Sequence, residues 1–140
     1  MIKEIVTDDE FLSRPSEKAT AEDASVAQDL LDTIAAGEEA ACLAANQIGV
    51  LKAVVVYLDE QDKPYIMYNP VLKQGLYPFK ANETCLSHGD KEMKVTRFNK
   101  IQVAYDDLVD GALVPKKRKL EGWTAVVVQH MIDHCNGKLV

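Results

Sequence analysis

Hydrophobic positions near the N-terminus repeat with the period of an amphipathic helix. They recur every three or four residues, at Val26, Ala27, Leu30, Leu31 and Ile34. Thr20 and Asp23 have the spacing of a capping box before this run, and Gly37 follows it. The pattern predicts a helix from Ala21 to Ala36.

Short runs of β-branched and aromatic residues follow, each bounded by turn residues, and they predict strands. The predicted strands cover residues 53–58, 65–68, 71–76, 101–105 and 112–120. Asn69-Pro70 separates the second run from the third. Asp110-Gly111 is a hairpin turn signal, so the last two segments are expected to pair antiparallel.

Trp123 to Cys135 contains no helix breaker before Asn136-Gly137, which is typical of a helix C-terminus. The order of elements is therefore a helix, several strands and a second helix. No repeat or shift in composition divides the chain. We expect a single α+β domain over residues 1–140, with mostly antiparallel strands.

The composition excludes disordered and low-complexity classes, because 47% of the 140 residues are hydrophobic and 27% are charged. A formal net charge of -6 disfavours a specific nucleic-acid partner. The N-terminus lacks the features of a signal peptide, and no apolar run approaches the length of a membrane span. We therefore expect a cytoplasmic protein without membrane contact, in which cysteine thiols pack, react or bind metal.

His130 and His134 lie four residues apart in the second predicted helix, so both imidazoles project from one face. Trp123, Val126 and Val127 share that face, which predicts that the histidines point inward. Two neutral ring nitrogens can hold one divalent cation. A pair of ordinary core or surface histidines is the alternative, and it is favoured unless a third ligand exists.

Cys85 is the candidate for that third ligand, because a thiolate is a strong metal donor. It lies between strand-like segments, outside any apolar periodicity that would bury it as a simple core residue. One thiolate and two imidazoles leave a fourth tetrahedral position for water, which is the arrangement of a catalytic zinc-type site rather than a closed structural one.

Three segments, in this order, resemble the motifs of peptide deformylase. They are Cys42-Leu43-Ala44-Ala45-Asn46-Gln47, Glu83-Thr84-Cys85-Leu86-Ser87 and Gln129-His130-Met131-Ile132-Asp133-His134. Further matches at Asn69-Pro70, Val95-Thr96-Arg97 and Glu121-Gly122-Trp123 extend the resemblance over nearly the whole chain from the first helix onward. The resemblance implies the small α+β deformylase fold, with mostly antiparallel strands around a metal-binding C-terminal helix.

The resemblance also implies a reaction and a set of ligands. Cys85, His130 and His134 would bind one iron(II) or zinc ion. The family hydrolyses the N-formyl group from the N-terminal methionine of new polypeptides, so the implied partner is an N-formylmethionyl peptide or a similar peptide N-terminus. The side-chain amide of Gln47 and the backbone N–H of Leu86 would donate to the oxyanion.

One departure from the family pattern concerns proton transfer. Met131 occupies the position of the family's general base, a glutamate, and a thioether has no ionisable proton. We therefore expect weak or absent deformylase activity. Two alternatives stay open: an active deformylase in which His88 or Glu83 carries the proton, and a non-catalytic protein that binds a peptide or small ligand.

Three motif glycines of the family are replaced in the substrate-binding segments, by Ala40, Cys42 and Thr84. Each replacement adds a Cβ that narrows the cleft, unless the loops have re-formed around it. Leu43 belongs to the same substrate-binding set.

Several other side chains have more than one interpretation. Packing is favoured over metal ligation for Cys42, which would otherwise close the metal site as a fourth ligand, and for Met131. Cys135 is expected in the core. Glu83 and Asp133 either orient the metal ligands through hydrogen bonds or are solvated carboxylates.

The basic run Lys116-Lys117-Arg118-Lys119 is expected to be a solvated sheet edge. A docking patch for ribosomal RNA, and thus a transient ribosome contact, is the less favoured alternative because the net charge opposes it.

Overall fold

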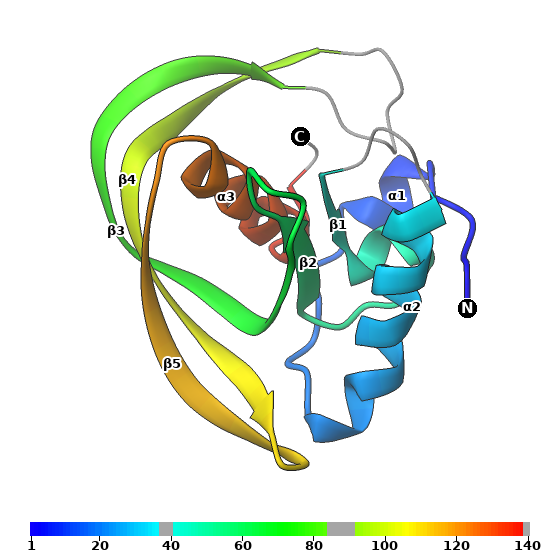
Figure 1. Ribbon diagram of the computed structural model, residues 1–140. Coiled ribbons are helices and arrows are strands. Elements are labelled where there is room, and N and C mark those ends of the chain that lie inside the picture. Colours follow the sequence, from blue (N-terminus) through cyan, green and yellow to red (C-terminus); the bar gives the residue numbers. More distant parts are fainter. Residues whose placement is uncertain (37–40, 84–91, 139–140) are drawn as a thin grey trace.

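A curved antiparallel sheet forms the centre of the computed structural model, which describes residues 1–36, 41–83 and 92–138 (Figure 1). Its strands lie side by side in the order of the chain: β1 (Cys42–Ala44), β2 (Val54–Leu58), β3 (Pro64–Glu83), β4 (Met93–Val109) and β5 (Ala112–Glu121). Helix α2 (Ala24–Ala36) packs on one face and α3 (Trp123–Cys135) on the other. The expected α+β class and antiparallel pairing are confirmed.

Strand β2 is buried on both faces, which explains its continuous apolar run. Val54 and Val56 pack with α2, whereas Val55 and Tyr57 pack with α3. Because successive side chains of a strand point to opposite faces, each face receives every second residue. The sheet therefore separates two hydrophobic clusters, one beneath each helix.

The first predicted helix is confirmed in extent, with one local difference. Its first turn, Ala21–Asp23, is a 3-10 helix that leads into α2, and Thr20 and Asp23 form the predicted capping box. A further short helix, α1 (Asp9–Leu12), was not expected; its Leu12 is fully buried. No helix among the described residues has the length and apolar character needed to cross a bilayer.

The prediction of two short strands at residues 65–68 and 71–76 is wrong, because β3 runs unbroken through both and on to Glu83. Asn69 adopts a left-handed conformation, with φ of 53°, at one of two register shifts that bend the strand without ending it. Its side chain hydrogen-bonds the backbone N–H and C=O of Ala19 and the carboxylate of Asp106. Tertiary contacts thus hold the bulge.

The predicted hairpin between β4 and β5 is confirmed. Asp110 and Gly111 both have positive φ, as a type I′ turn requires. Among the described strands β5 pairs with β4 alone. Lys116, Lys117 and Lys119 are exposed on this sheet edge, which agrees with the prediction of a solvated edge. Both strands curve around α3 (Figure 1).

The Phe98 ring on β4 lies over Gly75 on β3. A Cβ at Gly75 would lie 2.5 Å from this ring. We predict that Gly75→Ala lowers the free energy of unfolding by about 1–3 kcal/mol, because the half-buried ring must move. Urea denaturation measures the change. The neighbouring exposed variant Gln74→Ala is the control, and equal stability of the two variants would contradict the prediction.

Candidate metal centre

Helix α3 presents its two histidines to the interior. The Nε2 atoms of His130 and His134 are 3.1 Å apart, and the side chains are 5% and 1% exposed. The inward orientation predicted from their spacing is confirmed, and Val127 is buried with them. Trp123, which was expected on the same inward face, is 40% exposed, because the first turn of α3 lies at the surface.

The spacing of the two nitrogens fits a single metal ion. Two imidazoles on one tetrahedral ion, each at about 2.0–2.1 Å, have nitrogens about 3.3 Å apart. Nδ1 of His130 lies 2.8 Å from Oε1 of Glu83, so the proton belongs on Nδ1 and the lone pair on Nε2. A carboxylate behind a ring nitrogen is the usual support of a ligating histidine.

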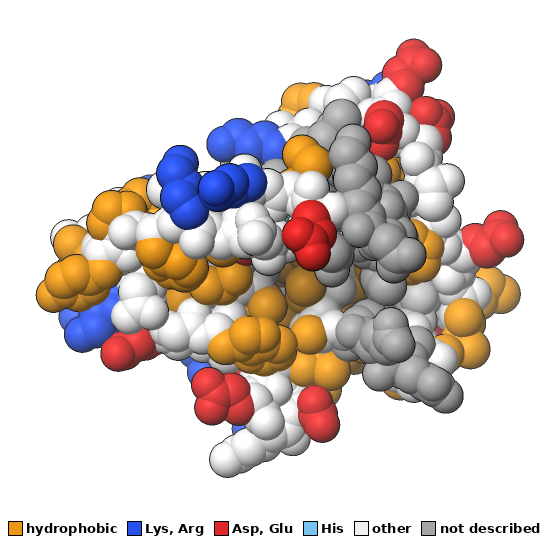
Figure 2. Space-filling model, turned by 90° about the horizontal axis from the view of Figure 1, so that it is seen from above, with side chains coloured by type: hydrophobic (Ala, Val, Ile, Leu, Met, Phe, Trp, Pro, Cys, Tyr) orange, Lys and Arg blue, Asp and Glu red, His pale blue; other side chains and the backbone are white. Residues whose placement is uncertain are grey.

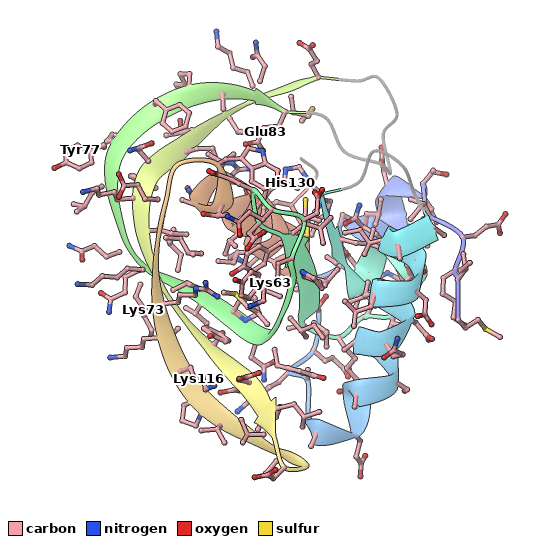
Figure 3. The ribbon with its side chains drawn as sticks, viewed as in Figure 1. Lys63, Lys73, Tyr77, Glu83, Lys116 and His130 are labelled. Carbon is pink, nitrogen blue, oxygen red and sulfur yellow. The ribbon has the colours of Figure 1, made fainter. Side chains whose placement is uncertain are left out.

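A cluster of ion pairs joins the segments around these histidines, and Figure 3 labels Glu83 at the end of β3 and His130 on α3. Arg97 on β4 is 4% exposed and donates from Nε and Nη2 to both oxygens of Glu83, at 2.8 and 2.7 Å. Its Nη1 donates to Asp133 at 2.6 Å. Glu83 ends β3 and Asp133 belongs to α3, so one guanidinium connects three elements. These contacts agree with the interpretation that Glu83 and Asp133 orient the metal ligands through hydrogen bonds.

The ion cluster also determines the charge of Glu83. Burial alone would raise its carboxyl pKa, but hydrogen bonds from His130 and Arg97 outweigh burial and lower the pKa to about 2. Glu83 is therefore an anion at neutral pH with both oxygens engaged. Such a carboxylate is a poor proton acceptor.

The segment β1 and the 3-10 helix Ala45–Ile48 form a second wall beside α3. The amide oxygen of Gln47 accepts a hydrogen bond from the backbone N–H of Ala44 at 2.9 Å, which fixes the orientation of the side chain. Asn46 donates from Nδ2 to the carbonyl oxygen of His134 at 3.0 Å and so ties this wall to α3. Neither the Asn46 contact nor the clamping role of Arg97 was inferred from the sequence, although both residues lie within the motifs quoted for the resemblance.

The remaining candidate residues take different positions. Leu43 is fully buried in the cluster beneath α2, so only its backbone is available to a ligand. Cys42 is half-buried and packs against the cluster beneath α3, while Met131 is 1% exposed within that cluster. Both observations agree with packing. Cys135 is a core residue, as predicted, and burial raises the pKa of its thiol to about 12.

Five predicted residues lie outside the described part of the chain: Ala40, Thr84, Cys85, Leu86 and His88. Among the residues that the structure describes, His, Cys, Asp and Glu form no group of three arranged to hold a metal. The described part of the site is thus the histidine pair and the groups that orient it.

The fold and the histidine pair show that this is a small α+β protein with a candidate metal site on its C-terminal helix. The family model for polypeptide deformylase matches residues 2–140. Peptide deformylase of Clostridium beijerinckii is 39% identical over 143 residues, covering 100% of both sequences. The chain therefore belongs to the peptide deformylase family, whose members are metal-dependent.

Solved deformylases have the same fold. The structure from Thermus thermophilus has a TM-score of 0.86 and 29% identity, and the match covers 99% of this chain and 84% of that one. The deformylase of Ehrlichia chaffeensis in complex with actinonin has a TM-score of 0.85 and 30% identity, with coverage of 99% and 86%. The deformylase fold expected from the motifs is confirmed.

Removing the guanidinium of Arg97 takes the shared cation from two largely buried carboxylates, so that Glu83 keeps only His130 and Asp133 only the more distant Lys138 as ion-pair partners among the described residues. We predict that Arg97→Met destabilises the protein by about 3–5 kcal/mol. The control, Lys116→Met, breaks the exposed pair with Asp107 and should cost at most about 1 kcal/mol. Urea unfolding of both variants measures the difference, and equal losses would contradict the clamping role.

Proposed function

We propose that this protein is a peptide-deformylase-like metalloprotein in which Cys85, His130 and His134 hold one divalent ion. The observation that carries the proposal is the facing pair of Nε2 atoms, with the Glu83 carboxylate behind His130. Cys85 follows Glu83 by two residues, and two residues of chain span at most about 7 Å. A connection of this length is short enough for a Cys85 ligand to join the histidines.

One sulfur and two nitrogen ligands suit zinc and iron(II). When bound, such an ion supplies Lewis acidity to a carbonyl group. The protein's own part is to hold the ligands: Arg97 positions Glu83, and Glu83 keeps the lone pair of His130 directed at the site. Asp133 fixes the helix that carries both histidines to the same arginine.

We propose a peptide N-terminus as the ligand, in the cytoplasm, where new polypeptides are made. Among the described strands β1 pairs only with β2, and an extended peptide can bind to such an edge strand through main-chain hydrogen bonds. We propose that the peptide is bound by the segments that contain Ala40, Cys42, Leu43 and Thr84. The buried side chain of Leu43 restricts that residue to main-chain contact.

The amide of Gln47 and the backbone N–H of Leu86 would donate to the oxygen on which charge develops. The hydrogen bond from Ala44 to the oxygen of Gln47 supports this role, because it turns the donor end of the amide away from β1. Each such donor is worth about 3–4 kcal/mol of transition-state stabilisation.

Proton transfer is the step for which the described residues are poorly equipped. Met131 occupies the base position and has no ionisable group, so we propose that deformylase activity is weak or absent. Glu83 is not a suitable substitute, because its pKa is about 2 and its oxygens are bound to Arg97 and His130. An active deformylase would have to rely on another group, of which His88 is the named candidate.

Metal analysis tests the ligand set. Protein purified without oxygen should contain about one equivalent of iron or zinc, and Cys85→Ala should lose most of it. Cys42→Ala is the matched control and should retain the metal, because Cys42 packs against the core. Equal metal content in the Cys85 variant and the wild type would overturn the proposed site, and loss in the Cys42 variant would make Cys42 a ligand.

Restoring the carboxylate tests the catalytic deficit. Met131→Glu should raise turnover of a formyl-methionyl peptide by about 10²- to 10⁴-fold, because it supplies a general base. Met131→Gln has the same size without a base and should stay at the wild-type rate. Ordinary turnover by the wild type would contradict the proposed deficit. If the Glu variant stays inactive while a formyl peptide raises the melting temperature of the wild type, the binding-protein alternative is favoured.

A further inference from the structure

The outward face of the β3–β4–β5 sheet carries lysines that the proposed metal site does not use. Ile101, Val103 and Leu120 pack beneath α3, so the alternating residues between them point away from the helix. We name this surface the outer sheet face and define it by the residues Lys73, Gln74, Leu76, Lys100, Gln102, Lys117 and Lys119.

Two shallow hollows follow the outer sheet face. One, of about 310 Å³, is lined by Leu76, Lys100, Lys119 and Glu121 together with the amides of Gln74 and Gln102. The other, of about 390 Å³, has Lys73, Lys116 and Lys117 in its lining. Register places Lys119 opposite Gln102, and Lys117 opposite Ala104, so the hollows are neighbours along the same strands.

An exposed aromatic ring borders these lysines. Tyr77 is 63% exposed, and Nζ of Lys100 lies 5.9 Å from the centre of its ring. Its φ of 60° is unfavourable for a tyrosine. The side chain points away from α3 into solvent (Figure 3). A flat apolar ring beside cations is the combination that stacks on nucleobases.

The charges of the protein are segregated. Residues 1–62 contain 14 of the 22 acidic residues and only 4 of the 16 basic ones. Many of these acids lie in or beside α1 and α2, on the other side of the molecule from β3 to β5. On the face shown in Figure 2, most of the visible Lys and Arg side chains form one group, whereas the visible Asp and Glu side chains are scattered. The net charge of -6 therefore does not describe the field at the outer sheet face.

We propose that the outer sheet face binds an RNA strand, with Lys73, Lys100, Lys117 and Lys119 contacting phosphates and Tyr77 stacking on a base. The charge segregation removes the objection drawn from net charge. The biological setting, RNA exposed on the ribosome where new polypeptides appear, rests on the proposed function. The inference that this face binds RNA depends on the lysines and Tyr77 and not on the proposed function.

The same face fits a strand better than a flat anionic membrane. Glu121 lies 3.9 Å from Lys100, and Asp106 borders the second hollow. A planar layer of anionic headgroups would meet these carboxylates together with the lysines. A single strand can make its phosphate contacts at Lys73, Lys117 and Lys119, which form no ion pair with an acid in the described part of the chain, and meets Glu121 only beside Lys100.

The test is binding of full-length protein to a fluorescent 20-nucleotide oligouridylate at several salt concentrations. Lys117→Glu/Lys119→Glu should weaken binding at least about 10-fold and reduce the slope of log K against log salt by about 1.4, because two contacts with a single strand are lost. Arg14→Glu/Lys18→Glu makes the same change of charge at exposed sites near α1 and should bind as the wild type does.

Tyr77→Ala should weaken binding about 10-fold with the salt slope unchanged, whereas Tyr77→Phe should retain affinity. Equal loss in the two charge-reversal variants, or none in either, would overturn the proposal, as would preference for anionic phospholipid vesicles over RNA. Metal content and the melting-temperature shift with formyl peptide are measured on the same variants. Loss of RNA binding with both unchanged separates this surface from the proposed function.

Discussion

The contact between Arg97 and two carboxylates is the constraint on which the candidate site depends. A guanidinium can donate to both oxygens of Glu83 and to Asp133 at once, which an ammonium group cannot do with the same geometry. The contact holds the end of β3 and the helix α3 in fixed relation. Because Glu83 in turn bonds His130, the orientation of an imidazole depends on an arginine that does not touch its ring.

This arrangement separates two requirements of a hydrolytic metal site. The parts that orient ligands are present: a carboxylate behind one histidine, an arginine behind the carboxylate and a facing pair of ring nitrogens. Proton transfer needs a group with an accessible proton and a pKa near neutrality. Met131 lacks such a group, and the network that makes Glu83 a good support lowers its pKa too far for that task.

Local patterns predicted much of the fold. The spacing of apolar residues located α2 and α3, and Asp110-Gly111 located the hairpin, because these signals depend on neighbours in sequence. The sequence pattern wrongly predicts that a strand ends at Asn69. In the structure β3 continues through this residue, and the side chain of Asn69 contacts Ala19 and Asp106, which are distant in the sequence. The histidine pair could be predicted from its spacing. The convergence of Arg97 on Glu83 and Asp133 could not, because it joins two strands and a helix.

X-ray absorption spectroscopy of metal-loaded protein tests the central claim most directly. A site formed by Cys85, His130 and His134 predicts one sulfur at about 2.3 Å and two nitrogens at about 2.0–2.1 Å from the ion. The sulfur should disappear in Cys85→Ala. A shell of only nitrogen and oxygen in the wild-type protein would contradict the account.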